Sequence, residues 1–256
     1  MAARPLTASM TLTAWMLLAG PLVGLSYAQR NQPVYPAYDG YLKNPDGSYT
    51  LAFAYFSHNA ETVTIPPGAG NAFAPNPGDR QQPTTFKPGH WRFQCIMVVG
   101  PDFDGKMAWN LTYSGTTTGT SQRMLQPNWF LVEGAEELGK IDFANVPRGV
   151  CLNQRPTVRV LGVSGRGNAS SLSTAVGQEL SLFGSVNDEG LPRGRQLAAS
   201  WKQVSGPGTV KFQDPAATRT HATFSAPGEY ELELSASDSE LSATSRVRVN
   251  VAATKP

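Results

Sequence analysis

Residues 201–251 alternate apolar and polar side chains, and this alternation constrains the fold more than any other feature of the chain. Along 230–234 and 246–251 the pattern repeats every two residues, and clusters of Gly, Pro, Asp and Ser separate such runs. Leu232 falls on one face of its run and Glu231 on the other, as in a strand that buries one side and exposes the other. The stretch is therefore predicted to form half of a small antiparallel β-sandwich.

Composition extends this prediction to the rest of the chain. The 256 residues include 25 Gly and 20 Pro, and 40% of the residues are hydrophobic. Such a chain is too apolar for disorder, and its Gly and Pro favour many short strands over helices. The length allows two ordinary domains. The formal net charge is +2 without a cluster of Lys and Arg, so nucleic acid is not an expected partner.

Residues 1–28 have the features of a secretory signal peptide. Arg4 is the only charge, an apolar stretch follows, and Ser26 and Ala28 place small residues where a signal peptidase reads them. A retained membrane anchor is the alternative, but a Gly-Pro pair interrupts the apolar stretch, which is also short for a bilayer span. We therefore expect a secreted, periplasmic or cell-surface protein whose mature chain has no transmembrane segment.

Export makes the two cysteines informative. An oxidising compartment favours a disulfide between Cys95 and Cys151, and closing a loop of that length stabilises a fold by up to about 4 kcal/mol. Two buried free thiols are the alternative, since buried Cys behaves as a small hydrophobic residue. Neither cysteine has a second Cys or His at the spacing of a metal site.

Residues 29–153 are interpreted as a first β-sandwich built from short strands. The expected strands cover residues 48–59, 61–65, 91–99, 107–114 and 128–133, and one helical turn is expected at 133–138. Residues 29–41 are expected to form an extended lead-in and 115–120 a polar turn. The Pro- and Gly-rich residues 66–90 form an unusually long loop, which makes them a candidate binding region.

Residues 154–252 are interpreted as a second sandwich, followed by a tail at 253–256. Strands are expected at 157–163 and 178–186, and Trp201 is expected on a central strand. The motifs that carry a resemblance occur in this order: VNDEGLP at 186–192, WKQVSGPG at 201–208, FSAPGEY at 224–230 and LSASDSELS at 234–242.

On these motifs, residues 154–252 resemble the bacterial PKD/Ig-like domain family. The resemblance implies a seven-stranded sandwich that serves as an extracellular spacer or interaction module. The WDFGDG run of the best-known members is absent, and Ser239 stands where a glycine commonly follows the aspartate, so the resemblance implies fold rather than ligand chemistry. The N-terminal region resembles an uncharacterised exported bacterial β-sandwich.

Calcium is the best small-ligand hypothesis for the second sandwich, although no cofactor is required by the sequence. Asn187, Asp188 and Glu189 follow one predicted strand and Asp238 follows another, and these two loops meet at one end of an immunoglobulin-type sandwich. Their oxygen atoms suit a hard cation. The alternative is that Asp188 and Asp238 cap turns by accepting hydrogen bonds from their own backbone.

Tyr35, Tyr38 and Tyr41 are candidate glycan-binding residues, because they precede the first clear strand and packing does not obviously require them. Their alternative role is to pack the lead-in onto the first sandwich. Trp91, Trp109 and Trp201 lie in apolar strand patterns and are expected in the cores.

No catalytic motif is present in the sequence. His58, His90 and His221 lie in turn-like or strand-end settings, and there is no nucleophile elbow, zinc-protease motif or phosphate loop. We therefore expect an all-β, non-catalytic protein of two tandem antiparallel sandwiches that interacts with envelope or extracellular proteins or glycans, in adhesion, assembly or as a spacer. The alternatives are a carbohydrate-binding accessory protein and a hydrolase, each using the N-terminal sandwich.

Overall fold

The computed structural model describes residues 31–120, 123–131, 141 and 143–254. The described chain forms two β-sandwiches in tandem and contains no α-helix, which confirms the predicted all-β class. The predicted signal peptide at 1–28 and the predicted helical turn at 133–138 lie outside the described residues. Within the described part, no helix has the length and apolarity required to cross a bilayer.

The N-terminal sandwich consists of the strands β1 to β8, which form two three-stranded sheets and a small pair. Their bounds are β1 Val34–Lys43, β2 Tyr49–Ser57, β3 Val63–Thr64, β4 Asn71–Ala74, β5 Thr85–Phe86, β6 Gly89–Val99, β7 Ala108–Tyr113 and β8 Thr116–Gly119. One sheet has the order β1-β2-β6, the other β4-β7-β8, and β3 pairs with β5. Two 3-10 turns, η1 Pro127–Trp129 and η3 Phe143–Asn145, follow β8.

The C-terminal sandwich consists of the strands β9 to β16. Their bounds are β9 Thr157–Leu161, β10 Ser171–Ala175, β11 Leu180–Asn187, β12 Ala198–Ser205, β13 Val210–Phe212, β14 Arg219–Phe224, β15 Gly228–Ser237 and β16 Ser242–Ala252. The two sheets have the orders β10-β16-β15-β12 and β13-β14-β11-β9. All pairings are antiparallel except β10 with β16, which is parallel.

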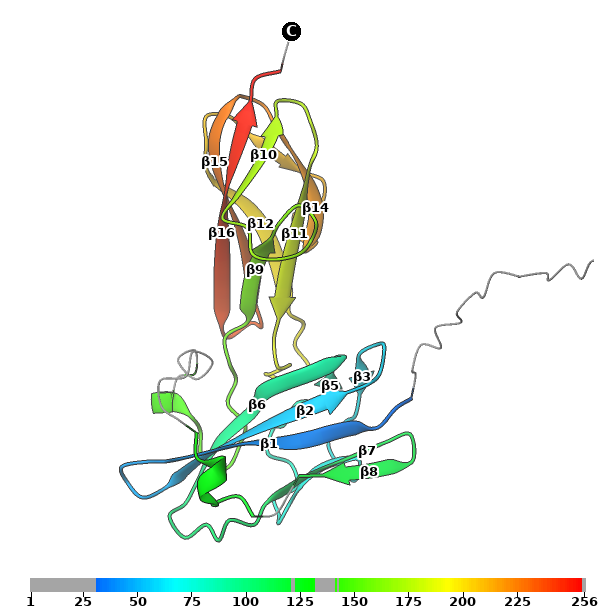
Figure 1. Ribbon diagram of the computed structural model, residues 1–256, viewed down its shortest axis with the longest axis vertical. Helices are drawn as coiled ribbons and strands as arrows, with labels where there is room; N and C mark the ends of the chain where they lie inside the picture. The colour runs from blue at the N-terminus through cyan, green and yellow to red at the C-terminus, as the bar shows by residue number, and fades with distance from the viewer. Residues whose placement is uncertain (1–30, 121–122, 132–140, 142, 255–256) are drawn as a thin grey trace, which may run out of the picture.

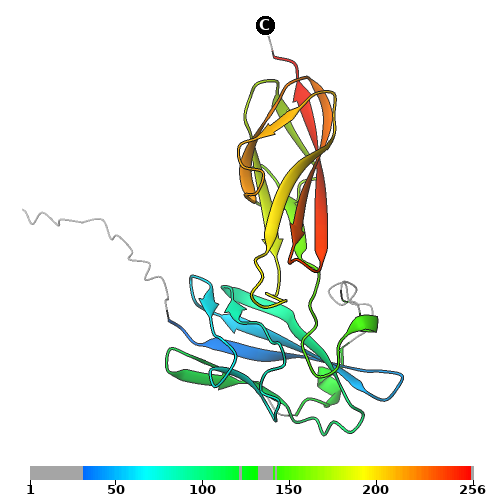
Figure 2. The same ribbon diagram turned by 180° about the vertical axis from the view of Figure 1, so that it is seen from behind.

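The two sandwiches stand at a steep angle to each other (Figures 1 and 2). In both views the strands of the C-terminal sandwich run upright, whereas β1, β2 and β6 lie across its lower end. The connection from β11 to β12 lies at that lower end and reaches down toward β6 and β5. The end of β16 lies at the opposite tip, far from the N-terminal sandwich.

Each sandwich has its own apolar core, as the alternating strand patterns predict. Phe53 and Trp109 are fully buried between the sheets of the N-terminal sandwich, and Phe73 stacks on the Trp109 indole at 5.6 Å between ring centroids. In the C-terminal sandwich, Leu232 and Trp201 are buried in a separate cluster. Trp109 and Trp201 are therefore core residues, as expected, whereas Trp91 is only partly buried and packs against the edge of the N-terminal core.

The structure explains the glycine of the WKQVSGPG motif. Gly206 has a φ of +145°, and a Cβ placed there would lie 2.1 Å from the ring of Tyr230, so only glycine allows this approach. The Tyr230 hydroxyl donates to the Ala226 carbonyl at 2.8 Å. The Gln203 side chain closes the hairpin by donating to Gly208 O at 2.7 Å. Motif residues far apart in the sequence thus stabilise one end of the sandwich.

Several expected elements differ from the structure. The lead-in at 29–41 contains most of the long strand β1, and the polar turn at 115–120 contains β8. The expected strand at 128–133 is wrong where it is described, because Pro127 begins a 3-10 turn instead. Trp201 lies on β12, which is an edge strand rather than a central one.

Candidate functional site: the joint between the sandwiches

Residues 188–193, which follow β11, form a joint with the N-terminal sandwich. Leu191 belongs to this loop of the C-terminal sandwich, yet it is 3% exposed and packs in the core cluster of the N-terminal sandwich with residues such as Phe86. Gly190 comes so close to β5 that a Cβ on it would lie 3.0 Å from Thr85 Oγ1. The loop therefore inserts into the neighbouring sandwich.

Arg193 ties the same loop to residues 66–90, the long loop that the sequence singles out. Its two terminal nitrogens donate to the two carboxylate oxygens of Asp79, with Nη1 2.9 Å from Oδ2, and its Nε donates to Gln82 O at 3.1 Å. The guanidinium lowers the pKa of the Asp79 carboxyl below its usual value. A two-pronged Arg–carboxylate pair fixes direction as well as distance, so Arg193 holds its loop against residues 79–82 in a defined direction.

Two further contacts span the joint on its other side. Lys87 Nζ donates to the Asp188 carbonyl at 3.3 Å and lies 5.2 Å from the centre of the Trp91 ring. The Gln154 amide donates to Glu189 Oε1 at 2.8 Å, and the Gln154 side chain donates to the Phe93 carbonyl at 2.6 Å. The short connection between the sandwiches is therefore held from both ends.

Three carboxyl groups of the C-terminal sandwich gather at this joint. Burial, together with the smaller effect of the charges of Asp188 and Asp238, raises the pKa of Glu189 to about 8. Burial also raises the pKa of Asp188, although the Gly190 amide acts in the opposite direction. A neutral Glu189 side chain at neutral pH lowers the repulsion among the three groups.

The side chains proposed to bind calcium make the turn-capping contacts that the sequence offered as the alternative. Asp188 Oδ1 accepts from the Gly190 amide at 2.8 Å, and Asp238 Oδ1 accepts from the Leu241 amide at 2.6 Å. Asn187 Nδ2 donates to Ser185 Oγ at 3.3 Å instead of joining the two aspartates.

Each of the two aspartates has a second carboxylate oxygen that takes no part in turn capping. Oδ2 of Asp188 and Oδ2 of Asp238 are buried without a hydrogen-bond partner in the described chain. However, the described residues contain no group of three His, Cys, Asp or Glu side chains arranged to hold a metal ion. Calcium binding at Asn187, Asp188 and Asp238 thus stays a prediction.

The three candidate glycan-binding tyrosines do not share a face. Tyr35 is 42% exposed on the outer face of β1, whereas Tyr38 is 6% exposed and packs against Phe53 and Trp129. Tyr41 is half-buried against the rings of Tyr49 and Phe130. A sugar ring has no open face of Tyr38 on which to stack, so that residue is corrected to a core position.

The histidines do not form a catalytic arrangement within the described chain. His58 is exposed and packs edge-on against Phe56, with ring centroids 4.4 Å apart. His90 lines a cleft of about 460 Å³ beside the joint, which Asp188 and Glu189 also line, but it makes no hydrogen bond to either carboxyl. His221 Nδ1 lies 3.3 Å from Ser181 Oγ on an exposed strand face.

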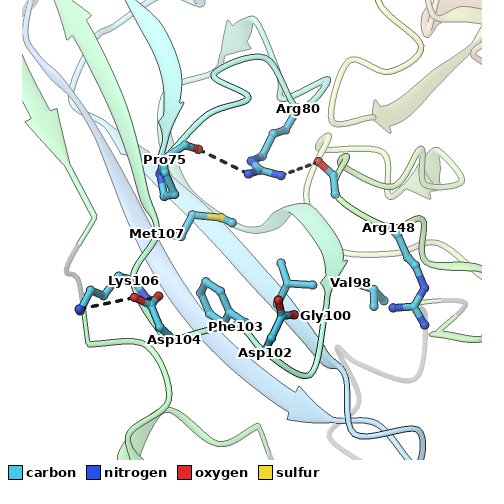
Figure 3. A pocket seen from close by; sticks show the side chains of 12 residues that line it. Pro75, Arg80, Val98, Gly100, Asp102, Phe103, Asp104, Lys106, Met107 and Arg148 are labelled. Atoms are coloured by element: carbon cyan, nitrogen blue, oxygen red, sulfur yellow. Dashed lines mark hydrogen bonds and ion pairs between the residues drawn. The ribbon is translucent and has the colours of Figure 1, made fainter.

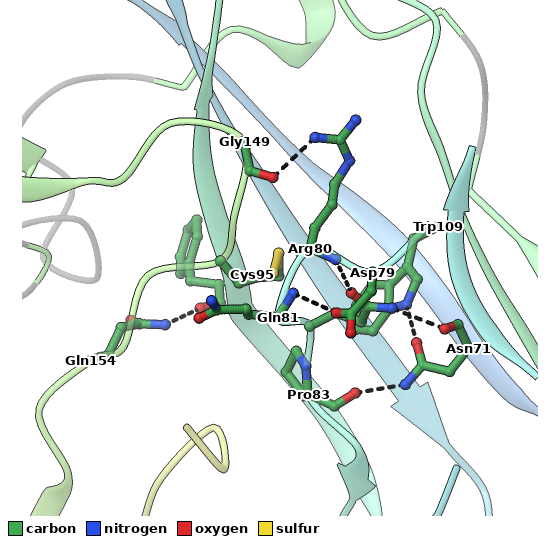
Figure 4. Close-up of a disulfide and its surroundings, with 12 residues drawn as sticks. Asn71, Asp79, Arg80, Gln81, Pro83, Cys95, Trp109, Gly149 and Gln154 are labelled. Atoms are coloured by element: carbon green, nitrogen blue, oxygen red, sulfur yellow. Dashed lines mark hydrogen bonds between the residues drawn. A yellow bond between two sulfur atoms is a disulfide. The ribbon is translucent and has the colours of Figure 1, made fainter. Parts of the chain in front are cut away.

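The predicted disulfide is confirmed, and it supports the loop at the joint. Cys95 on β6 bonds to Cys151, with their Cα atoms 4.8 Å apart (Figure 4). The Cys151 amide donates to the Arg80 carbonyl at 2.7 Å. The disulfide thus fastens the chain before the C-terminal sandwich to β6 and, through Arg80, to the long loop.

A buried polar network, which sequence reasoning missed, holds the long loop in shape. The Asn71 side chain donates to Pro83 O at 2.8 Å and accepts from the Trp109 indole at 2.9 Å (Figure 4). Gln82 Nε2 donates to Asn71 O at 2.9 Å, while its Oε1 accepts from the Arg80 amide at 2.7 Å. A network in which every buried polar group is hydrogen-bonded specifies one conformation. The long loop at residues 66–90 therefore keeps a defined shape although it contains little strand pairing.

Comparison with known proteins identifies the C-terminal sandwich. Residues 171–251 match the family model described as K319L-like, PKD domain. The solution structure of the PKD domain from KIAA 1837 protein is 20% identical, with a TM-score of 0.26, over 35% of this chain and 85% of that one. The PKD domain of human KIAA0319 is 14% identical, with a TM-score of 0.28, over 38% of this chain and 83% of that one. Three N-terminal domains of the bacteriophage RB49 Highly Immunogenic Outer Capsid protein are 8% identical, with a TM-score of 0.27, over 85% of this chain and 58% of that one.

The fold and the four motifs define the class of the C-terminal sandwich as PKD/Ig-like. Within this class, the family model that residues 171–251 match is the one described as K319L-like, PKD domain. Of the joint residues, Leu191 lies within the first motif, VNDEGLP, and Arg193 directly follows that motif. The sequence could have indicated the joint, because an apolar side chain and a proline stand in an otherwise polar loop. A turn that is fully exposed to solvent does not need an apolar side chain, so this pattern is typical of a loop that is partly buried.

Proposed function

We propose that the chain is an exported, non-catalytic interaction or structural protein, in which the PKD sandwich holds the N-terminal sandwich in a fixed orientation outside the cytoplasm. The insertion of Leu191 into the N-terminal core carries this proposal. Linked domains tumble independently unless their interface is large or well anchored. A buried leucine, the Arg193 to Asp79 pair and the Lys87 contact anchor this one.

Export is supported by the Cys95–Cys151 disulfide, since such bonds persist in oxidising compartments. The test is to produce the full chain, separate the cytoplasm from the periplasm, surface and medium, and treat each fraction with a maleimide in denaturant, because Cys95 and Cys151 are buried in the folded chain. The proposal predicts unlabelled protein outside the cytoplasm. Cys151→Ser serves as the control, because its Cys95 thiol must then be labelled. Labelled wild-type protein that stays in the cytoplasm would refute export.

A carbohydrate-binding accessory role is the second candidate, because aromatic rings line the outer face of the β1-β2-β6 sheet. Tyr35 lies edge-on to His58 at 6.2 Å between ring centroids, and Phe56 lies 6.1 Å from His90. Tyr35→Ala is expected to weaken glycan binding more than tenfold, since a stacking ring is lost. A glycan array probed with both proteins measures this. Equal binding by both would contradict the role.

A further inference from the structure

A cleft in the N-terminal sandwich contains a buried arginine without a carboxylate partner. The cleft has a volume of about 630 Å³ and is lined by the end of β6, the turn before β7 and the long loop. Arg80 comes from that loop and is 8% exposed (Figure 3). In the described chain, no Asp or Glu lies within ion-pair distance of its guanidinium.

The Arg80 guanidinium uses few of its donors. Nη1 donates to the Gly149 carbonyl at 2.9 Å, Nη2 reaches the Pro75 carbonyl at 3.5 Å, and Nε is buried with no partner. A guanidinium has five N–H donors, so three are left over. Burial lowers the pKa of Arg80, which shows that its surroundings compensate the charge poorly. An unpaired buried cation is costly, and a bound anion would relieve that cost.

The other charges in the cleft do not compensate Arg80. Asp102 and Asp104 lie at the exposed rim on the far side of the cleft in Figure 3, where solvent screens them. Lys106 pairs with Asp104 at 3.5 Å, and Arg148 pairs with Asp46, outside the cleft, at 2.7 Å. The cleft therefore has one uncompensated cation inside and acidic groups at its mouth.

Apolar side chains separate the buried cation from the rim. Met107 and Phe103 lie between Arg80 and the two aspartates in Figure 3, and Val98 and Val99 form part of the wall. Among the described residues that line the cleft, Phe103 is the only one with an aromatic ring, so this lining offers little for sugar stacking. An apolar side chain beside a carboxylate matches this lining better than a polyhydroxylated ring does.

From this arrangement we propose that the cleft binds the C-terminal carboxylate of an apolar peptide segment of a partner protein, with the carboxylate on Arg80 and the last side chain over Phe103 and Met107. The rim aspartates then accept from backbone N–H groups of the incoming peptide. The Cys95–Cys151 disulfide supports this site, because it positions the segment that carries the Gly149 carbonyl. This inference rests on the proposed interaction role and names the chemistry of the partner.

The test is titration of the full chain with acetyl-Gly-Val-Leu bearing a free carboxylate and with the same peptide as a C-terminal amide. The arginine Nε–H signals in nitrogen–proton NMR spectra give a direct readout. The free acid is expected to shift the Arg80 signal and to bind about 10- to 100-fold more tightly than the amide, because a charge-assisted pair is lost. Arg80→Gln is expected to lose the same factor, whereas Arg148→Gln at the rim changes affinity less than threefold.

Several results would overturn the proposal. Equal binding of acid and amide, no binding of either, or binding of a galacturonic acid oligosaccharide in place of the peptide would each contradict it. If Arg80→Gln does not fold, the comparison of acid with amide on the unchanged chain still decides. Export is tested separately by the thiol-labelling experiment, which involves no peptide. Failure of the proposed function and failure at the cleft are therefore distinguishable.

Discussion

Replacing Leu191 by Ala tests whether the joint is part of the N-terminal core. The side chain is 3% exposed and packs among core residues of the N-terminal sandwich, although it belongs by sequence to the C-terminal one. Removing a buried leucine side chain to this extent costs about 2–5 kcal/mol. A loss of about 3 kcal/mol raises the population of open states, and thus amide exchange, by roughly 100-fold.

Hydrogen–deuterium exchange by mass spectrometry locates the effect. We expect faster exchange in peptides of β5 and β6, far from Leu191 in sequence, when Leu191→Ala is compared with wild type. Leu182→Ala is the matched control, because Leu182 is fully buried in the C-terminal core and its loss is expected to raise exchange in that sandwich. If Leu191→Ala left β5 and β6 unchanged, Leu191 would not belong to the N-terminal core.

Three further predictions concern the joint and its supports. Glu189 has a folded pKa raised to about 8 from 4.5, so its contribution to stability is fully present below pH 4.5 and is lost as pH rises to 8. The free energy of unfolding in urea should therefore fall by at most about 5 kcal/mol between pH 4.5 and pH 8, and this fall should be absent in Glu189→Gln. Parallel plots of the free energy of unfolding against pH for the two proteins would contradict the prediction. Reducing Cys95–Cys151, which are 56 residues apart, should cost about 4 kcal/mol in the same assay, and no loss would refute the role of the bond. Calcium at 100 times its dissociation constant should raise the free energy of unfolding of the wild-type chain by about 2.7 kcal/mol and leave that of Asp238→Asn unchanged. Equal unfolding midpoints of the wild-type chain with calcium and with chelator would refute the calcium site.

Alternation and cysteine content predicted much of the architecture. The strands around Leu51 and Leu232 have a clear period of two and bury the expected face, although β2 also buries its other face, for instance at Ala52. Residues 95–98 of β6 form a continuous apolar run, and both of its faces are buried there. The disulfide was predicted from two cysteines in a chain that the sequence led us to expect in an oxidising compartment. These features are local or compositional, and therefore a sequence displays them directly.

Strand β1 was missed because its sequence contains turn-forming residues. Pro36 is tolerated because β1 is an edge strand, where the missing N–H of a proline does not interrupt the hydrogen bonds between two strands inside the sheet. An irregularity in the pairing between Tyr38 and Gly40 then changes the register. Tyr35 and Tyr38 are three residues apart, and residues separated by an odd number of positions point to opposite faces of a strand. The regular spacing of the tyrosines in the sequence therefore did not predict a single binding surface.

The candidate site was predicted only in part, since its residues meet through tertiary contacts. The sequence indicated residues 66–90 as a binding region and 187–189 as a functional loop, and both lie at the joint. It did not indicate that Leu191 enters another sandwich or that Arg80 lacks a carboxylate. Such pairings depend on which loops face each other after folding, and no local pattern encodes them.

The fixed orientation of the two sandwiches is the central claim, and residual dipolar couplings of backbone amides in a weakly aligned sample test it most directly. The structure predicts that β1 to β8 and β9 to β16 report one alignment tensor with the same magnitude and axes. Leu191→Ala combined with Arg193→Ala is expected to give two tensors of different magnitude. Two different tensors for the wild-type chain would contradict the claim, because the sandwiches would then reorient independently.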